Sequence, residues 1–251
     1  MVANRRARCA RRECLAAHPL HPLALPALMV LQPGVKALSW LLALMMAPTP
    51  TEIATFDTAI YGKTPAGWMG GAARPGDAAS WKVIKDPTAP SQPYVLAHVP
   101  SGGPAGPRPA ILEDHQCSDG EIIVRFKALS RDAEPQAGLV WRYRDPGNYY
   151  YVRANAANRN VILYRVSGGK SIPLAPRGRA SHDYTVPHHV FPDSWTILKV
   201  VFSGPRMSVY YNHRRILQVE DAHFTGSGRV GVWTRASSAA HFDDFKLFAR
   251  R

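Results

Sequence analysis

The stretch GLVWRYRDPGNYYYVRANAANRNVILYRV, residues 138–166, contains three runs in which apolar and polar side chains alternate. Successive side chains of a strand point to opposite faces of a sheet, so each run is typical of a β-strand. Between the first two runs stand Asp145, Pro146, Gly147 and Asn148, residue types that favour a tight turn. The stretch therefore predicts successive antiparallel hairpins and an all-β fold.

The same alternation predicts which side chains share a face. Trp141 and Tyr143 are expected on one side of the first strand, opposite Arg142. If the strands pair as hairpins, Arg142, Arg153 and Arg165 line up across one face. Three unpaired guanidiniums are costly to bury, so this face should be solvated or should contact a hydroxyl-rich or anionic ligand. The predicted ligand-binding residues are Arg142, Tyr151, Arg153, Asn155 and Arg165.

The rest of the chain repeats strand and turn from residue 53 onwards. Further strands are expected at 80–86, 94–99, 121–129, 195–203, 228–236 and 241–249, with a hairpin at 207–220. The segments 101–109, 113–120 and 172–194 are expected as loops, because they are rich in Pro, Gly and polar residues. About ten strands and no convincing amphipathic helix favour a β-sandwich.

The first 47 residues have the layout of a secretory signal segment. The uncharged apolar run ALSWLLALMMA, residues 37–47, follows Lys36 and precedes Pro48. This run is shorter than the roughly 20 residues that span a bilayer, and it fits the apolar region of an export signal. Cleavage near residue 47 predicts a secreted or periplasmic protein with no stable membrane insertion.

Two alternatives remain open for this segment. Met45 stands where a cleavage site prefers a small residue, so an uncleaved anchor is the alternative to export. Residues from Met29 onwards make a complete signal segment by themselves, so the residues before Met29 are interpreted either as an over-extended start, residues 1–28, or as a basic n-region.

The net charge of +13 raises nucleic acid, anionic lipid and acidic polysaccharide as partners. The first 47 residues hold six basic residues against one acid, which leaves 25 basic and 17 acidic residues, a net charge of +8, for the rest. Export argues against nucleic acid, so an oligosaccharide or polysaccharide is the expected partner. Cys117 is the single cysteine outside the first 47 residues, so the domain must be held together by its core.

The order of these pieces resembles the concanavalin A-like lectin/glucanase superfamily. The pieces are FD at 56–57, GLVWRY at 138–143, NYYYVRAN at 148–155, NVILYRV at 160–166, WTILKV at 195–200, GRVGVWT at 228–234 and FDDF at 242–245. Over residues 53–249, the likeness is closest to secreted bacterial domains related to laminin G-like modules and to the 3-keto-disaccharide hydrolase domain. It implies a jelly-roll sandwich of two curved antiparallel sheets, with a sugar site on the concave face.

The resemblance leaves three functions open. Retaining glucanases of this superfamily carry an E-x-D-x-x-E strand motif, whose two carboxyls stand about 5 Å apart, and the chain contains no such motif. The leading hypothesis is therefore an exported lectin-like domain that binds a glycan on its concave face. The alternatives are a glycoside-cleaving enzyme related to 3-keto-disaccharide hydrolases and a structural or protein-binding laminin G-like module.

Metal, thiol and imidazole chemistry are weaker hypotheses. No cofactor is expected, although a structural calcium ion held by Asp57 with Asp243 or Asp244 is conceivable, since Ca²⁺ prefers oxygen ligands. A thiol nucleophile would be Cys117 with a base at His115. An acid/base or metal cluster would involve the loop residues His182, Asp183, His188 and His189, with His98 as a further candidate. Trp141 or Trp233 is a candidate for stacking on a sugar ring.

Overall fold

The predicted hairpins form the centre of one sheet. Strands β7 (Gln136–Asp145), β8 (Asn148–Asn155) and β9 (Asn160–Ser167) pair as antiparallel neighbours. Asp145 and Asn148 lie opposite each other at the first turn, where the Asp145 carboxylate accepts a hydrogen bond of 2.7 Å from the amide of Gly147. The side chain of Asp145 therefore closes the turn as the sequence predicts.

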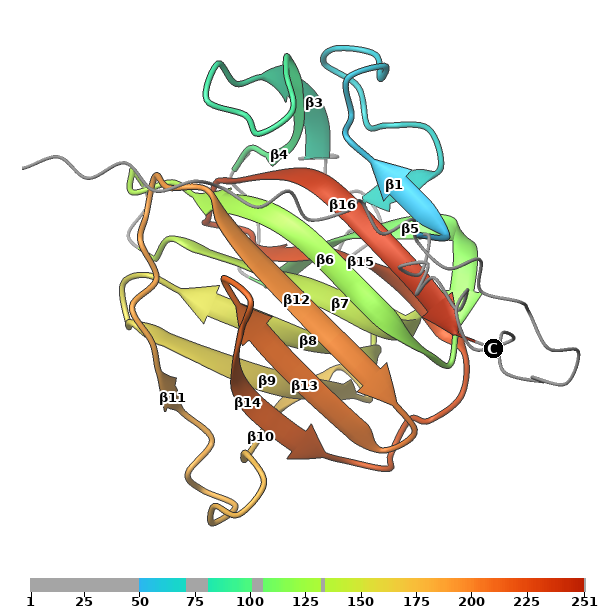
Figure 1. Ribbon diagram of the computed structural model, residues 1–251, viewed down its shortest axis with the longest axis vertical. Coiled ribbons are helices and arrows are strands. Elements are labelled where there is room, and N and C mark those ends of the chain that lie inside the picture. The colour runs from blue at the N-terminus through green and yellow to red at the C-terminus, as the bar shows by residue number, and fades with distance from the viewer. Residues whose placement is uncertain (1–49, 71–80, 101–105, 132–133, 251) are drawn as a thin grey trace, which may run out of the picture. The chain divides into compact units, whose positions relative to one another are not determined.

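The computed structural model describes residues 50–70, 81–100, 106–131 and 134–250. All of them lie in one compact unit, Ala47–Arg251. The predicted signal segment at residues 1–47, with the start proposed for residues 1–28, lies outside the described residues. Within these ranges the chain forms sixteen strands in two antiparallel sheets, which confirms the all-β sandwich (Figure 1). No helix of the described ranges is long and apolar enough to cross a membrane.

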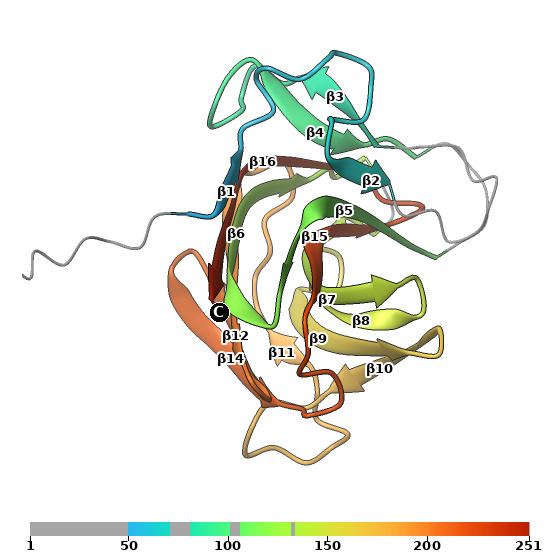
Figure 2. The ribbon, with the colours of Figure 1, turned by 90° about the vertical axis from the view of Figure 1, so that its right-hand side faces the viewer.

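The two sheets form the two layers of the sandwich (Figure 2). The first sheet has the order β14 (Arg214–Glu220), β13 (Arg206–Tyr211), β12 (Thr196–Ser203), β6 (Asp119–Ala128), β16 (Ala240–Arg250), β4 (Tyr94–His98), β3 (Trp81–Lys85), with β1 (Glu52–Ala54) beside β16. The second has the order β10 (Lys170–Leu174), β9, β8, β7, β15 (Gly228–Arg235), β5 (Pro107–Cys117), β2 (Trp68–Gly70), with β11 (Val186–Pro187) beside β9.

The main core lies between the inner faces of the sheets. Trp141 of β7 stacks on Tyr150 and on Phe202 of β12, with ring centroids 5.8 and 6.3 Å apart. Phe242 of β16 packs on Trp81 from the other end of the first sheet. All of these side chains are buried, so Trp141 is a core residue and is unavailable to a sugar.

Strand β5 is the main element that the sequence does not predict. Residues 107–109 and 113–117 were expected in loops, the first of them because Pro107 and Pro109 lack the amide that a ladder needs. The short β2 pairs only with residues 110–112 of β5, so the prolines lie where β5 has no described strand on that side. The amide hydrogens that Pro107 and Pro109 lack are therefore not needed for pairing between β5 and β2.

A bulge in β7 changes the faces that alternation predicts. The register between β7 and β8 shifts between Trp141 and Asp145, and Arg142 adopts a left-handed φ of 48°. Tyr143 consequently packs against Tyr149 on the outer face of the sheet, rather than beside Trp141 in the core. The prediction that Trp141 and Tyr143 share a face is wrong, because the bulge breaks the period of two.

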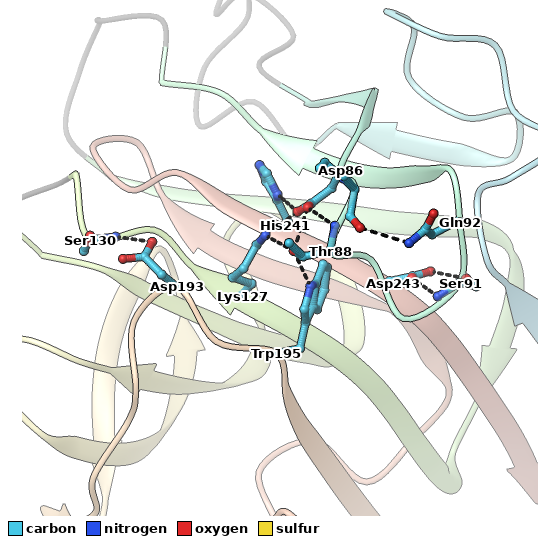
Figure 3. A network of polar contacts seen from close by, with 11 residues as sticks. Asp86, Thr88, Ser91, Gln92, Lys127, Ser130, Asp193, Trp195, His241 and Asp243 are labelled. Carbon is cyan, nitrogen blue, oxygen red and sulfur yellow. Dashed lines mark hydrogen bonds and ion pairs between the residues drawn. The ribbon is translucent and has the colours of Figure 1, made fainter.

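The outer face of the first sheet carries a buried ion-pair network (Figure 3). Asp86, which follows β3, is paired with Lys127 of β6 and accepts a hydrogen bond of 2.7 Å from Nδ1 of His241 on β16. Its other oxygen accepts bonds from the amide and hydroxyl of Thr88. The network, defined as Asp86, Thr88, Lys127 and His241, fastens the β3–β4 connection to the sheet.

Candidate functional site

A surface cavity of about 240 Å³ lies on the outer face of the second sheet. Residues of β5, β7, β8, β10 and β15 contribute to its wall, so it spans most of the sheet. Its lining residues are Gly106, Pro107, Gln136, Tyr151, Arg153, Ser171, Trp233 and Arg235. This set, called the outer cavity below, combines aromatic rings with amide, hydroxyl and guanidinium groups.

Glycine at position 138 lets side chains from β8 and β15 meet over β7. Gly138 lies directly opposite Arg153 on one side and Trp233 on the other. A Cβ at this position would lie 1.9 Å from the carbonyl oxygen of Val152 and 3.5 Å from the Trp233 ring. The Val152 carbonyl oxygen therefore excludes any side chain at position 138, where a Cβ would stand between Arg153 and Trp233.

The aromatic side chains at the outer cavity form one stacked row. The Tyr151 ring stacks on Trp233 with a centroid distance of 4.6 Å and on Tyr164 with a distance of 4.7 Å. Both faces of Tyr151 are thus covered by protein, and a ligand can reach only its edge and hydroxyl group. Burial raises the pKa of Tyr151 to about 12, so the phenol stays protonated at neutral pH and donates a hydrogen bond to Ser171.

The polar groups of the outer cavity are incompletely paired within the described part of the chain. Arg153 donates to Oδ1 of Asn160 at 3.2 Å and its guanidinium lies 5.5 Å from the centroid of the Tyr164 ring. Its Nε is buried without a hydrogen-bond partner, as is Oε1 of the fully buried Gln136. Buried polar atoms are normally paired, so these two atoms mark a place for a polar ligand or water.

The structure separates the five residues that the sequence assigns to ligand binding. Tyr151 and Arg153 line the outer cavity. Asn155 is fully buried opposite Gln136, and its Oδ1 accepts a bond from the amide of Asn158 at the turn after β8. Asn155 therefore lies beside the cavity but does not line it.

Arg142 holds backbone together inside the protein. Its side chain is fully buried, and its Nε donates to the carbonyl of Ser118 at 2.9 Å. The two terminal nitrogens donate to the carbonyls of Phe224 and Gly204 at 2.6 and 2.7 Å. One of them also contacts Asp119 at 3.3 Å. Arg142 thus offers no exposed surface to a ligand.

Arg165 lies on the opposite face from Arg153. It is the cross-strand neighbour of Tyr150, whose ring points into the core. Arg153 lies three residues further along β8 and therefore points to the opposite face. Arg165 forms an ion pair of 2.5 Å with Asp221, which also accepts a bond from the Tyr150 hydroxyl. The prediction that Arg142, Arg153 and Arg165 line up is wrong, because of the bulge at 142 and this register.

Three lining residues were missed as partners of Tyr151 and Arg153. Gln136 and Arg235 were not assigned to a site, and Ser171 was placed next to a predicted loop. Trp233 was a candidate for sugar stacking, and it does lie at the cavity. The alternation in GRVGVWTRA places Trp233 and Arg235 on one face, but it does not show that β15 lies beside β7.

A second cavity, of about 210 Å³, lies on the outer face of the first sheet. Its lining includes Arg125, Lys199 and Asp244. Arg125 pairs with Asp244 at 3.1 Å, and Lys199 pairs with Glu121 at 3.4 Å. These pairs neutralise much of its charge, so the outer cavity remains the stronger candidate.

The groups considered for metal or thiol chemistry are engaged elsewhere. Asp57 accepts a bond from the amide of Tyr94, and Asp243 accepts two from Ser91. Burial raises the pKa of Cys117 to about 11, so its thiol is protonated at neutral pH and is a poor nucleophile. In the described ranges no group of three His, Cys, Asp or Glu side chains is placed to hold a metal ion.

The histidines of the predicted loop cluster have separate surroundings. His188 packs on the ring of Tyr211, and His189 packs on Phe191. His98 is buried on β4, where its Nδ1 lies 2.7 Å from the carbonyl oxygen of Ser238. The described residues therefore do not bring these histidines together as one site.

The fold is shared with proteins of the concanavalin A-like lectin/glucanase class. No protein-family model matches the chain, and no curated protein matches it in sequence. A carbohydrate binding module, CBM66, from Bacillus subtilis superposes with a TM-score of 0.55 and 14% identity, over 76% of this chain and 99% of that one. The domain thus has the jelly-roll sandwich that the sequence predicts.

Two further structures have the same architecture. The GH43 protein BlXynB from Bacillus licheniformis matches with a TM-score of 0.52 and 18% identity, over 80% of this chain and 39% of that one. The exoplasmic/lumenal domain of VIP36, in its Ca²⁺- and mannose-bound form, matches with a TM-score of 0.51 and 13% identity, over 79% and 88% of the two chains. At these identities the likeness concerns the fold.

Proposed function

We propose that this protein is an exported carbohydrate-binding protein that holds a sugar in the outer cavity. The observation that carries the proposal is the combination there of a stacked aromatic row with incompletely paired polar atoms of Arg153 and Gln136. Sugars present many hydroxyl groups, and guanidinium, amide and phenol groups can bind them by donating and accepting hydrogen bonds. Export rests on the signal-like pattern at residues 29–47.

Sugar binding is supported better than sugar cleavage. Hydrolysis of a glycosidic bond needs groups that transfer protons, usually two carboxyls on either side of the bond. The outer cavity is lined by neither a carboxylate nor a histidine. Any relation to 3-keto-disaccharide hydrolases or to laminin G-like modules would therefore concern the fold alone, and the outer cavity would bind a sugar without cleaving it.

Filling the outer cavity should abolish sugar binding while leaving the fold intact. Ser171 is exposed on β10 and lines the cavity, so Ser171→Trp adds a bulky ring there without emptying the core. The full-length protein on an array of neutral and acidic glycans should bind at least one glycan. Ser171→Trp should weaken that binding by about tenfold or more, because the added ring blocks the contacts between the cavity and the sugar. A tenfold change corresponds to about 1.4 kcal/mol of binding free energy.

The matched control is Ile172→Trp. Ile172 is the next residue on β10, is also exposed, and points to the opposite face. The Ile172→Trp variant should bind the glycan as the unmodified protein does. Ser171→Trp and Ile172→Trp should unfold at similar temperatures. Equal binding by the unmodified protein and Ser171→Trp would reject the cavity as the site, and binding of protein ligands alone would favour the laminin G-like alternative.

A further inference from the structure

The charge of the outer cavity narrows the class of sugar. Two of its eight lining residues, Arg153 and Arg235, are arginines, and none is an acid. Arg235 has a partner outside the lining, Glu134, at 3.3 Å, but both side chains are more than 40% exposed, so the pair is weak. The cavity therefore has a net positive potential.

Arg153 is the centre of this positive charge. It is half-buried on β8, and within the described part of the chain its contacts are with an amide oxygen of Asn160 and the ring of Tyr164, not with a carboxylate. Its Nε is buried and lacks a partner. A guanidinium without a carboxylate partner is suited to an anion that accepts from its terminal nitrogens.

The size of the outer cavity limits how much of a glycan it can hold. Its volume of about 240 Å³ lies below the range of roughly 300–1,000 Å³ that is usual for drug-sized ligands. A single sugar residue is the unit of a glycan that suits this volume. The Gln136 Oε1 atom supplies an acceptor for a sugar hydroxyl beside the guanidinium donors.

We propose that the outer cavity recognises one carboxylate-bearing sugar residue, a uronate, with Arg153 as the group that binds its carboxylate. This inference rests on the proposed function, because it assumes that the outer cavity is the sugar site. Beyond the proposed function, this inference specifies that the ligand is negatively charged and that Arg153 selects for the charge. The Tyr151 hydroxyl and Gln136 then contact the neutral part of the sugar.

Paired ligands that differ only in the carboxylate test this inference. The full-length protein is titrated by calorimetry with the methyl glycosides of glucuronic, galacturonic and mannuronic acid and with those of glucose, galactose and mannose. At least one uronide should bind at least tenfold more tightly than its neutral counterpart, because a hydrogen bond between two charged groups is stronger than one between neutral groups. The preference should shrink as salt is raised.

Arg153→Gln should remove the preference, weakening binding of the uronide far more than binding of the neutral glycoside, since glutamine keeps a donor but loses the charge. Lys246→Gln loses the same charge on the other sheet, where Lys246 lines the second cavity, and should keep the preference. Equal binding of neutral glycosides and uronides would overturn the inference and leave the proposed function standing. Failure of all six to bind would count against both.

Discussion

Replacing Arg142 with methionine is expected to lower the free energy of unfolding by about 3 kcal/mol or more. The substitution leaves the carbonyl oxygens of Ser118, Gly204 and Phe224 without their donor, and each buried unpaired acceptor costs about 1–3 kcal/mol. Urea denaturation of the full-length protein measures the change. Lysine should rescue little, because an ammonium group cannot reproduce the fork that reaches three carbonyls.

Arg144→Met is the matched control for this prediction. Arg144 is exposed on the same strand, where its guanidinium lies 4.8 Å from the centroid of the Phe224 ring. Its loss should cost about 1 kcal/mol or less, the range of an exposed cation–π contact. Similar losses in the two variants would contradict the structural role assigned to Arg142.

Replacing Lys127 with methionine should have the second large effect, again about 3 kcal/mol. Lys127 and Asp86 are both buried, with side chains 9% and 4% exposed, so the substitution leaves a buried carboxylate without its ion-pair partner. Arg206→Met is the control, because Arg206 and Glu220 pair at 3.1 Å with side chains 67% and 41% exposed. Breaking that exposed pair should cost less than about 1 kcal/mol.

The same network predicts a loss of stability in acid. Burial lowers the pKa of His241 more than the Asp86 carboxylate raises it, so the folded protein binds the His241 proton more weakly than the unfolded chain. Burial alone would raise the pKa of Asp86, but hydrogen bonds from Lys127, His241 and Thr88 hold it well below its usual range. Both depressed pKa values mean that stability is present at neutral pH and decreases on acidification.

Urea titrations from pH 8 to pH 3 check the sign of this effect. The free energy of unfolding should fall below about pH 6.5 through His241 and fall again below about pH 4 through Asp86, the ordinary values for these side chains. His241→Gln should flatten the first decrease, and Asp86→Asn should flatten the second. If the protein is more stable at pH 5 than at pH 8, and if His241→Gln and Asp86→Asn have the same pH dependence as the unmodified protein, the stabilising role assigned to the network is wrong.

Local patterns were sufficient for the central hairpins of the second sheet and for one hairpin turn of the first sheet. Alternation located β7, β8 and β9, and Asn212 and His213, between β13 and β14, take the left-handed φ values, 45° and 69°, that the predicted turn tolerates. Strand β5 was missed because its prolines are tolerated only where β5 lacks a neighbour, and that depends on the length of β2.

The site required information that no local pattern contains. The bulge at Arg142 is coupled to Gly228 of β15, where a Cβ would lie 2.5 Å from the Arg142 carbonyl carbon. The outer cavity likewise depends on β15 lying beside β7 (Figure 2). The facing positions Gly138 and Trp233 are 95 residues apart in the sequence, so no local pattern shows that they meet. Periodicity therefore placed Tyr151 and Arg153 on one face of β8, but it could not predict that Gln136, Ser171 and Arg235 line the same cavity.

A crystal structure of the full-length protein soaked with its best-binding sugar shows directly whether the outer cavity is the sugar site. We expect one sugar residue in the outer cavity, within hydrogen-bond distance of Arg153, Gln136 and the Tyr151 hydroxyl. A sugar bound instead in the second cavity, beside Lys199 and Lys246, with the outer cavity unchanged, would contradict it.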